Sequence, residues 1–251
     1  MSGTYESKYG RLEPSIAYKS DASGKMAVGK IFGDDNRERV ENVRELPYSA
    51  IWRLLIMVDG EAYRGTGYMI KPGIMLTAGH NIYDCNAKKY SDEVYAIGRD
   101  GMRHRLYDAF IPDEYKKCDM DIYDWAVAKI AIVPGETYSC IGLLNMDDGQ
   151  ALDIVNQRAE IAGFPVEVRN VTTHDMYREE GTIMAYDKDR KILNYQIDTS
   201  GGNSGSPVLV YKNTVPYAIG IHVRNTENCN IARAIDNRIA EAVDKLSSTK
   251  Y

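Results

Sequence analysis

The chain has 251 residues, 44% of them hydrophobic, which is enough for a substantial core and fits one large domain or two small ones. Asp and Glu number 36 against 31 Lys and Arg, and the formal charge of −5 disfavours a nucleic-acid binder with a broad basic surface. No segment approaches the roughly 18 consecutive apolar residues of a membrane span. We therefore expect a soluble globular protein that binds neither nucleic acid nor membranes.

The first 30 residues, Met1 to Lys30, are polar and show no helical or strand period. They also lack the apolar region of a secretory signal. We interpret residues 1–30 as a leader or pro-segment and residues 31–251 as the folded domain.

From residue 50 onward, short apolar or alternating runs are separated by Gly, Asn, Asp and Pro, a pattern typical of an all-β sandwich or barrel. The high count of 19 Tyr also favours strands. The predicted strands are 50–58, 67–70, 74–78, 94–97, 125–133, 160–164, 182–186, 192–197, 207–211 and 217–222.

Only the end of the chain predicts a helix. Apolar residues recur there at helical spacing, and Asp236 is a candidate N-cap. The recurring residues are Ile235, Ile239, Ala242, Val243 and Leu246.

The strongest chemical signal is the sequence SGGNSGSP at 200–207. Its glycines permit positive φ angles and leave backbone N–H groups that can stabilise an oxyanion next to Ser204. A serine nucleophile needs a base and a group that orients the base. His80, which ends the segment IMLTAGH at 74–80, is the candidate base. Asp124, directly before an apolar run, is the candidate acid.

Two further aspartates compete with Asp124 for the orienting role. Asp119 and Asp121 precede it closely, but no apolar strand follows either of them directly. We therefore expect them to be solvated loop charges.

Three motifs resemble the signatures of the chymotrypsin-fold serine proteases: TAGH at 77–80, DWAV at 124–127 and GNSGSP at 202–207. The Asn before the serine points to the bacterial glutamyl endopeptidase branch, and the segment IFGDDNR at 31–37 is similar to the mature amino terminus of that branch. The resemblance runs from about Ile31 to the terminal helix. It implies two packed six-stranded antiparallel β-barrels with a C-terminal α-helix and a site in the cleft between the barrels.

The resemblance also implies roles for individual residues. Ser204 would attack the scissile carbonyl, His80 would transfer the proton, and Asp124 would orient the imidazole. The N–H groups of Gly202 and Ser204 would form the oxyanion hole. Such an enzyme needs no cofactor or metal, acts on proteins or peptides, and is expected to be a secreted monomer.

Specificity is predicted from three residues near the nucleophile. His222 and Thr199 match the positions with which glutamyl endopeptidases hold an acidic side chain, which implies cleavage after Glu and less well after Asp. Asp198, six positions before Ser204, is the alternative, because a trypsin-like enzyme that cleaves after Lys or Arg keeps an acid there. A second alternative is a protease-fold binding protein without turnover.

The amino-terminal region and one arginine bear on whether the site is active. In the branch that this chain resembles, the freed α-amino group of the mature chain helps to bind the substrate carboxylate, which implies activation by cleavage near Lys30 or Ile31. Arg224 follows His222 where small residues are usual, and it would either add positive charge to the pocket or obstruct it.

The four cysteines and four histidines show no spacing typical of a metal site. Two disulfides and four free thiols are both compatible with Cys85, Cys118, Cys140 and Cys229. We expect His104 and His174, which have charged neighbours, to be surface residues.

Overall fold

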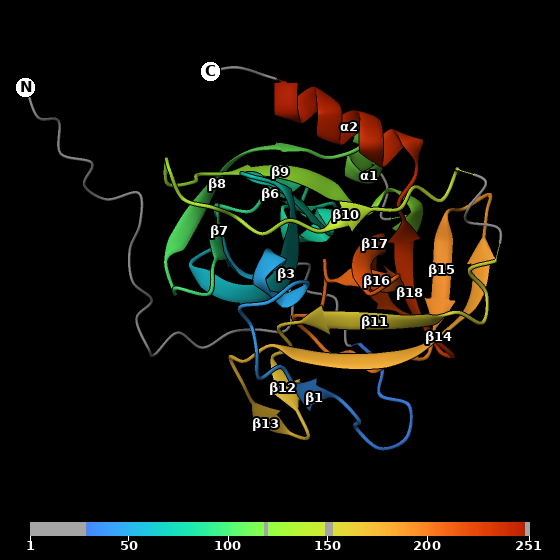
Figure 1. Ribbon diagram of the computed structural model, residues 1–251. Helices are drawn as coiled ribbons and strands as arrows, with labels where there is room; N and C mark the ends of the chain where they lie inside the picture. The colour runs from blue at the N-terminus through green and yellow to red at the C-terminus, as the bar shows by residue number, and fades with distance from the viewer. Residues whose placement is uncertain (1–28, 118–119, 149–152, 249–251) are drawn as a thin grey trace, which may run out of the picture.

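The structure is a computed structural model in which residues 29–117, 120–148 and 153–248 are described, and it consists of two β-barrels packed side by side (Figure 1). The first barrel is closed by six antiparallel strands in the order β2-β3-β4-β9-β8-β7. These strands are β2 (Ile51–Val58), β3 (Glu61–Lys71), β4 (Ile74–Thr77), β7 (Glu93–Ile97), β8 (Arg103–Phe110) and β9 (Ala126–Ile130).

The second barrel closes in the order β14-β11-β16-β17-β18-β15, because β15 also pairs with β14. Its strands are β11 (Arg158–Gly163), β14 (Tyr177–Asp187), β15 (Ile192–Tyr195), β16 (Pro207–Lys212), β17 (Val215–Asn225) and β18 (Asn230–Ala234). Two short strands extend this sheet, β1 (Glu38–Arg39) beside β14 and β10 (Gly142–Leu143) beside β17. The predicted pair of six-stranded antiparallel barrels is therefore confirmed.

The connections between barrel strands carry the remaining short elements. These are the hairpins β5 (Tyr83–Asp84) with β6 (Lys89–Tyr90) and β12 (Glu167–Val168) with β13 (Val171–Thr172), the short helix α1 (Asp113–Lys117), and the 3₁₀ turns η1 (Tyr48–Ala50), η2 (Gly79–Asn81) and η3 (Asp121–Tyr123). Two of them matter for function, because η2 directly follows β4 and η3 lies just before β9.

Two barrel strands, β8 and β18, have no counterpart among the strands predicted from sequence. In β8 the sequence RHRLYDAF is rich in charged and polar side chains, so it gives little apolar signal. In β18 the five residues NIARA are all buried, including Arg233. This arginine is accommodated because it donates to the Ile122 carbonyl and forms an ion pair with Asp236. A buried, paired arginine hides the strand from a hydrophobicity pattern.

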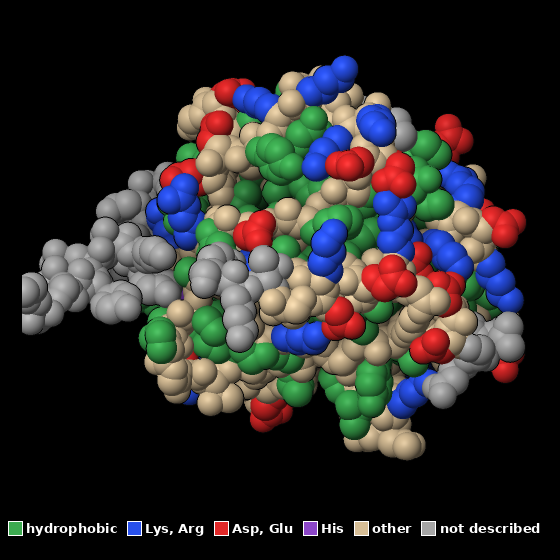
Figure 2. All heavy atoms as spheres, turned by 90° about the horizontal axis from the view of Figure 1, so that it is seen from above, with side chains coloured by type: hydrophobic (Ala, Val, Ile, Leu, Met, Phe, Trp, Pro, Cys, Tyr) green, Lys and Arg blue, Asp and Glu red, His purple; other side chains and the backbone are tan. Residues whose placement is uncertain are grey.

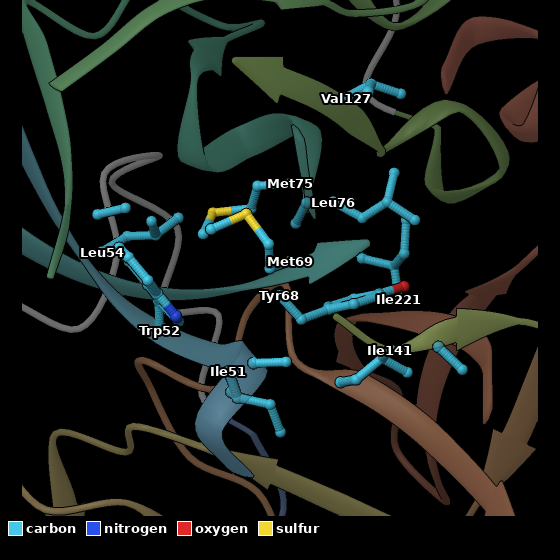
Figure 3. Packing of buried hydrophobic residues seen from close by; sticks show 14 of the residues in the cluster. Ile51, Trp52, Leu54, Tyr68, Met69, Met75, Leu76, Val127, Ile141 and Ile221 are labelled. Atoms are coloured by element: carbon cyan, nitrogen blue, oxygen red, sulfur yellow. The ribbon is translucent and has the colours of Figure 1, made fainter. Parts of the chain in front are cut away.

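One large hydrophobic cluster fills the first barrel and continues into the second (Figure 3). Tyr68 and Leu76 lie inside the first barrel, while Ile221 reaches the same cluster from β17. A separate cluster, which includes Leu193 and Val208, fills the second barrel. The barrels therefore share buried apolar surface, and the boundary between them is a packed interface.

The predicted C-terminal helix is confirmed as α2 (Asn237–Ser248). Asp236 caps it as predicted, because its Oδ1 accepts a hydrogen bond of 3.0 Å from the Ile239 N–H. The buried face of α2, which carries Ile239 and Val243, joins the cluster of the first barrel. The end of the chain thus packs back on the barrel formed by its beginning (Figure 1).

The surface seen from the α2 side carries Lys and Arg interspersed with Asp and Glu (Figure 2). No helix among the described residues is long and apolar enough to cross a membrane. Cys140 and Cys229 carry free thiols, whereas Cys118 lies outside the described residues.

The expectation that His104 is a surface residue is wrong. His104 lies on β8 and is only 1% exposed. Its Nδ1 is 2.8 Å from the Ala131 carbonyl oxygen, and its ring packs edge-on against Trp52. The flanking charges misled the prediction, because in a strand they point to the opposite face from His104. His174 is exposed as expected.

Candidate active site

The turn that carries Ser204 contacts the first barrel through hydrogen bonds. We call residues 198–206, which lie in the connection from β15 to β16, the Ser204 turn. The carbonyl of Ser204 accepts two hydrogen bonds of 2.9 Å, one from the Thr66 N–H of β3 and one from Asn81 Nδ2 of η2. Because η2 also contains His80, these contacts bring the candidate nucleophile and the candidate base to the same part of the interface.

His80 and Asp124 form a tightly held pair. Strands β4 and β9 pair with Thr77 opposite Ala126, so the residues that follow β4 and precede β9 are neighbours. Asp124 Oδ2 lies 2.7 Å from His80 Nδ1, and Oδ1 accepts a 2.9 Å hydrogen bond from the His80 N–H. Both side chains are buried. One carboxylate thus fixes both the ring and the backbone of the histidine, and Nε2 is the ring nitrogen that can act as a base.

The Ser204 turn depends on glycine at two positions. Gly202 has a φ of +95° and Gly205 a φ of +89°. A β-carbon at Gly205 would lie 2.1 Å from the Thr66 carbonyl oxygen, and one at Gly202 would lie 2.3 Å from the Phe164 carbonyl oxygen. Glycine is therefore required at both positions for the conformation, and at Gly205 it also permits the close approach of the turn to the first barrel.

Two carbonyls of the turn are held by hydrogen bonds, whereas the N–H groups of Gly201, Gly202 and Ser204 have no acceptor among the described residues. Gly201 O accepts from the Val166 N–H at 2.7 Å, and Gly202 O accepts from Thr66 Oγ1 at 2.8 Å. Within the described part of the chain, the N–H groups of Gly202 and Ser204 donate to no other residue. Such a pair of oriented donors suits a developing oxyanion.

Thr199 and His222, the predicted pocket residues, are both buried. The Thr199 hydroxyl is fully enclosed and has no hydrogen-bond partner among the described residues. A hydroxyl of this kind can donate a hydrogen bond to a ligand carboxylate. His222 is joined to the end of the Ser204 turn, because its carbonyl accepts from the Gly205 N–H at 2.8 Å.

The imidazole of His222 is held in its neutral form. Burial, with a smaller contribution from nearby His80, lowers the pKa of His222 to about 3. Its Nδ1 lies 2.6 Å from the hydroxyl of Tyr195, which is itself fully buried. When the tyrosine donates to Nδ1, the proton of the neutral ring is on Nε2, where it can be donated to a carboxylate.

The carboxylate of Asp198 accepts hydrogen bonds from the amino-terminal segment, by which we mean residues 32–37. Its Oδ1 accepts a 2.7 Å hydrogen bond from the Phe32 N–H, and its Oδ2 accepts one of 3.1 Å from the Asn36 N–H. Its own N–H donates to the carboxylate of Glu179. Both carboxylate oxygens of Asp198 thus fix the backbone of the amino-terminal segment by hydrogen bonds.

Arg224 forms an ion pair with Asp121. Arg224 Nε lies 2.5 Å from Asp121 Oδ1, and Nη2 donates to Oδ2 at 2.8 Å. The expectation that Asp121 is a solvated loop charge is wrong, because its side chain is only 11% exposed. Asp119 lies outside the described residues. The two-pronged pair links β17 to η3 and compensates the charge of Arg224.

Three residues that contact the site were missed from the sequence, namely Thr66, Asn81 and Tyr195. Asn81 directly follows His80, and Thr66 lies between two glycines, Gly65 and Gly67. These positions are suggestive signals, but the partners of the three side chains come from distant parts of the chain. Tyr195 gives no signal, because a tyrosine in a strand is usually a packing residue.

Comparison with known proteins identifies the family to which this chain belongs. Residues 65–219, more than half of the chain, match the trypsin-like peptidase domain. The chain is 28% identical over 197 residues to the glutamyl endopeptidase of Bacillus licheniformis, an alignment that covers 76% of this chain and 58% of that protein. The chain thus spans less than two thirds of this relative.

Two further similarities place the chain more broadly. It is 26% identical over 225 residues to a Bacillus subtilis protein named extracellular metalloprotease, covering 85% of this chain and 68% of that protein. Among the described residues, no group of three or more His, Cys, Asp or Glu side chains is arranged to hold a metal ion. A solved structure of a Glu endopeptidase in complex with MPD superposes with a TM-score of 0.71 at 24% identity, covering 88% of this chain and 100% of that one. The chain belongs to the trypsin-like peptidase domain family and, within it, resembles the glutamyl endopeptidase branch.

Proposed function

We propose that this protein is a serine endopeptidase that cleaves after Glu, and less well after Asp. Ser204 attacks the scissile carbonyl, His80 accepts its proton and passes it to the leaving amine, and Asp124 holds the imidazole and stabilises its charged form. The N–H groups of Gly202 and Ser204 stabilise the oxyanion of the tetrahedral intermediate. The observation that carries the reaction is the buried His80–Asp124 pair, 2.7 Å apart, beside the Ser204 turn.

Specificity for an acidic side chain is supported by Thr199 and His222. The Thr199 hydroxyl is buried without a partner among the described residues, and the neutral imidazole of His222 has one nitrogen held by Tyr195. A substrate carboxylate would accept hydrogen bonds from both groups. The negative charge would also raise the pKa of His222, and the protonated ring would then bind more strongly.

Cleavage after Lys or Arg, the alternative based on Asp198, is less well supported. Both carboxylate oxygens of Asp198 accept hydrogen bonds from the amino-terminal segment, at Phe32 and Asn36. A basic substrate side chain would have to compete with these buried contacts.

Activation by cleavage before Lys30 is supported by the position of Gly29. A β-carbon on Gly29 would lie 2.3 Å from Thr199 Oγ1, so the backbone at this residue occupies space beside the hydroxyl. The Lys30 carbonyl accepts from the Thr199 N–H at 3.2 Å, and the Lys30 N–H donates to Asn230 Oδ1 at 3.1 Å. Cleavage of the Gly29–Lys30 bond would clear this space and leave a positively charged amine next to the pocket. Leader residues 1–28 lie outside the described residues.

We infer further that the substrates are proteins or peptides outside the cell. The family is one of peptidases, and the Bacillus subtilis relative is named as extracellular. Because every group assigned to the reaction comes from one chain, we expect the monomer to be sufficient.

Peptides that differ only in the residue before the scissile bond test the specificity. We expect kcat/KM to fall at least about 100-fold from Glu to its neutral isostere Gln, because the buried donors would then lack a charged acceptor. Asp should be intermediate. Preference for Lys over Glu would contradict the acidic pocket.

A fluorophosphonate probe and mass spectrometry test the nucleophile and the activation step. We expect the probe to label Ser204, to leave the Ser204→Ala variant unlabelled, and to react with a species that begins at Lys30 or Ile31. Absence of labelling in that species would favour the binding protein without turnover. Full activity in a chain that still begins at Met1 would contradict activation by cleavage.

A further inference from the structure

The amino-terminal segment, residues 32–37, forms hydrogen bonds with the Ser204 turn at two residues, Asp198 and Ser200. At one end, Asp198 receives hydrogen bonds from the Phe32 and Asn36 N–H groups. At the other end, Arg37 reaches the turn at Ser200. These anchor points lie six and four residues before Ser204, so the segment contacts the turn at its base.

Arg37 is a buried cation that donates four hydrogen bonds. Its side chain is 4% exposed and forms two hydrogen bonds with the carboxylate of Asp35, of 2.9 and 2.8 Å. Nη1 donates to Ser200 Oγ at 2.7 Å, and Nη2 also donates to the Glu167 carbonyl at 3.0 Å. The planar guanidinium therefore fixes the relative position of three separate segments.

The carboxylate of Asp35 is held in turn by a second arginine. Asp35 Oδ2 accepts from the Arg169 N–H at 2.8 Å, and Arg169 Nη2 donates to the Arg37 carbonyl at 2.9 Å. The hydrogen bonds with Arg37 and Arg169 keep the pKa of Asp35 low, at about 2. The charged pair of Asp35 and Arg37 is therefore present throughout the range in which a histidine base works.

Ser200 passes the contact on to the residues around the nucleophile. Its hydroxyl donates to the Glu167 carbonyl at 2.9 Å, so it is fixed between Arg37 and β12. Its N–H donates to Asn203 Oδ1 at 3.2 Å, and its carbonyl accepts from the Asn203 N–H at 3.1 Å. Ser200 and Asn203 bracket the peptide groups of Gly201 and Gly202, whose orientation decides where the Gly202 N–H points.

We propose that Arg37 is a positioning residue for the oxyanion hole. By clamping Ser200 to the amino-terminal segment, it keeps the Gly202 and Ser204 N–H groups aimed at the same point. The proposal rests on the proposed function and adds a role for a residue that touches neither substrate nor triad. Because catalysis is sensitive to displacements of about 1 Å, loss of the clamp should slow the reaction more than it weakens substrate binding.

Three variants of the full chain, processed in the same way as the wild type, separate this role from stability. Arg37→Met removes the charge and all donors, Arg37→Lys keeps the charge without the planar fork, and Arg39→Met is the matched control. Arg39 lies two residues away and forms an exposed ion pair with Asp175. We expect kcat/KM to fall about 10- to 100-fold in Arg37→Met with KM within about threefold, partial rescue in Arg37→Lys, and no change in the control.

Two inhibitors give a readout that a merely structural role would not move. A peptide boronic acid ending in the preferred residue forms a tetrahedral adduct and needs the oxyanion hole, whereas the corresponding product peptide needs only the pocket. We expect the inhibition constant of the boronate to rise in parallel with the loss of kcat/KM in Arg37→Met, with that of the product nearly unchanged. Equal weakening of both inhibitors would overturn the proposal.

Hydrogen exchange tests the clamp without relying on turnover. We expect backbone amides of residues 198–206 to exchange about 10-fold faster in Arg37→Met than in the wild type or Arg39→Met. If Arg37→Met does not fold, Ser200→Ala, which removes the acceptor for Arg37 together with the hydrogen bond from the hydroxyl to Glu167, should show the same pattern more weakly. Unchanged exchange in both variants overturns the clamp. A wild type that cleaves no peptide refutes the proposed function, and the exchange measurement still decides the clamp.

Discussion

At the scale of single residues, the carboxylate of Asp124 has two tasks that its two oxygens divide. One oxygen holds the imidazole of His80 at Nδ1, and the other holds the His80 backbone N–H. An asparagine at position 124 could keep the backbone contact through its carbonyl oxygen. Its amide nitrogen cannot accept from the ring, so the imidazole would lose its orienting partner and adopt the other tautomer.

We therefore expect Asp124→Asn to fold normally and to lose about 10⁴-fold in kcat, the loss typical of such a change in a serine protease triad. Steady-state cleavage of the preferred peptide measures this loss, and thermal unfolding controls for stability. A loss below about tenfold would show that Asp124 does not orient the base.

His222 couples the stability of the fold to pH. Burial lowers its pKa to about 3 in the folded protein, whereas the unfolded chain has the ordinary value near 6.5. Between these values the unfolded state binds more protons than the folded state. The stability contributed by the neutral ring is therefore complete above about pH 6.5 and is lost as the pH falls toward 3.

Urea unfolding from pH 6.5 to 4 should show this dependence. We expect His222→Gln to flatten the slope of unfolding free energy against pH by up to about 1.4 kcal/mol per pH unit, whatever its effect on absolute stability. His174→Gln, at an exposed histidine, should change the slope less. Identical slopes in the wild type and His222→Gln would contradict the burial of a neutral imidazole.

At the scale of elements, two neighbouring carboxylates connect β14 to the amino-terminal segment. Glu179 lies on β14, and Asp198 accepts hydrogen bonds from the amino-terminal segment. Glu179 accepts a hydrogen bond from the Asp198 N–H, and the Asp198 carboxylate is close by. Burial, with the charge of Asp198, raises the pKa of Glu179 to about 7. The folded protein thus binds this proton more tightly than the unfolded chain, and stability falls as the pH rises from about 4.5 to 7.

Glu179→Gln should remove this loss, because glutamine keeps an acceptor for the Asp198 N–H without the charge. We expect the melting temperature to rise by about 2–4 °C at pH 8 and to change little at pH 5, since Glu179 is half-buried and solvent screens part of the effect. Glu241→Gln, at an exposed position on α2, is the control. A gain that is equal at both pH values would contradict the carboxylate pair.

The elements themselves were predictable where their signals are local. The apolar runs predicted ten of the twelve barrel strands, and the helical spacing with Asp236 predicted α2 and its cap. The strands β8 and β18 escaped because their polar side chains are satisfied by partners elsewhere, as Arg233 is by Ile122 and Asp236. A hydrophobicity pattern contains no information on such partners.

At the scale of the whole molecule, the hydroxyl of Thr66 connects the two barrels through hydrogen bonds. Its hydroxyl lies on β3 of the first barrel, donates to the Gly202 carbonyl at 2.8 Å, and accepts from the Phe164 N–H at 3.0 Å. It is completely buried. Both partners belong to the second barrel, so one hydroxyl joins the two halves directly beneath the Ser204 turn.

Thr66→Val has the same shape but leaves a buried carbonyl and a buried N–H unpaired. We expect the unfolding free energy to fall by about 2–6 kcal/mol, at about 1–3 kcal/mol for each unsatisfied group, together with a loss of kcat. Thr66→Ser, which keeps the hydroxyl, should retain most of both. Urea unfolding and peptide cleavage measure the two effects, and a valine variant as active and stable as the serine variant would contradict the role of the hydroxyl.

The sequence by itself determined what depends on neighbours along the chain. Turn glycines, alternating strands and the motifs around His80, Asp124 and Ser204 are local signals. The strands predicted an all-β fold, and the motifs carried the resemblance that implied the two barrels and the candidate triad. The tertiary structure decided what depends on distant partners. Asp124 meets His80 across 44 residues, Asn81 meets the Ser204 carbonyl across 123, and Thr66 meets Gly202 across 136. Burial and pairing arise only when the strands close into barrels, and for that reason Arg37, Arg224 and Tyr195 acquire their partners only in the folded molecule.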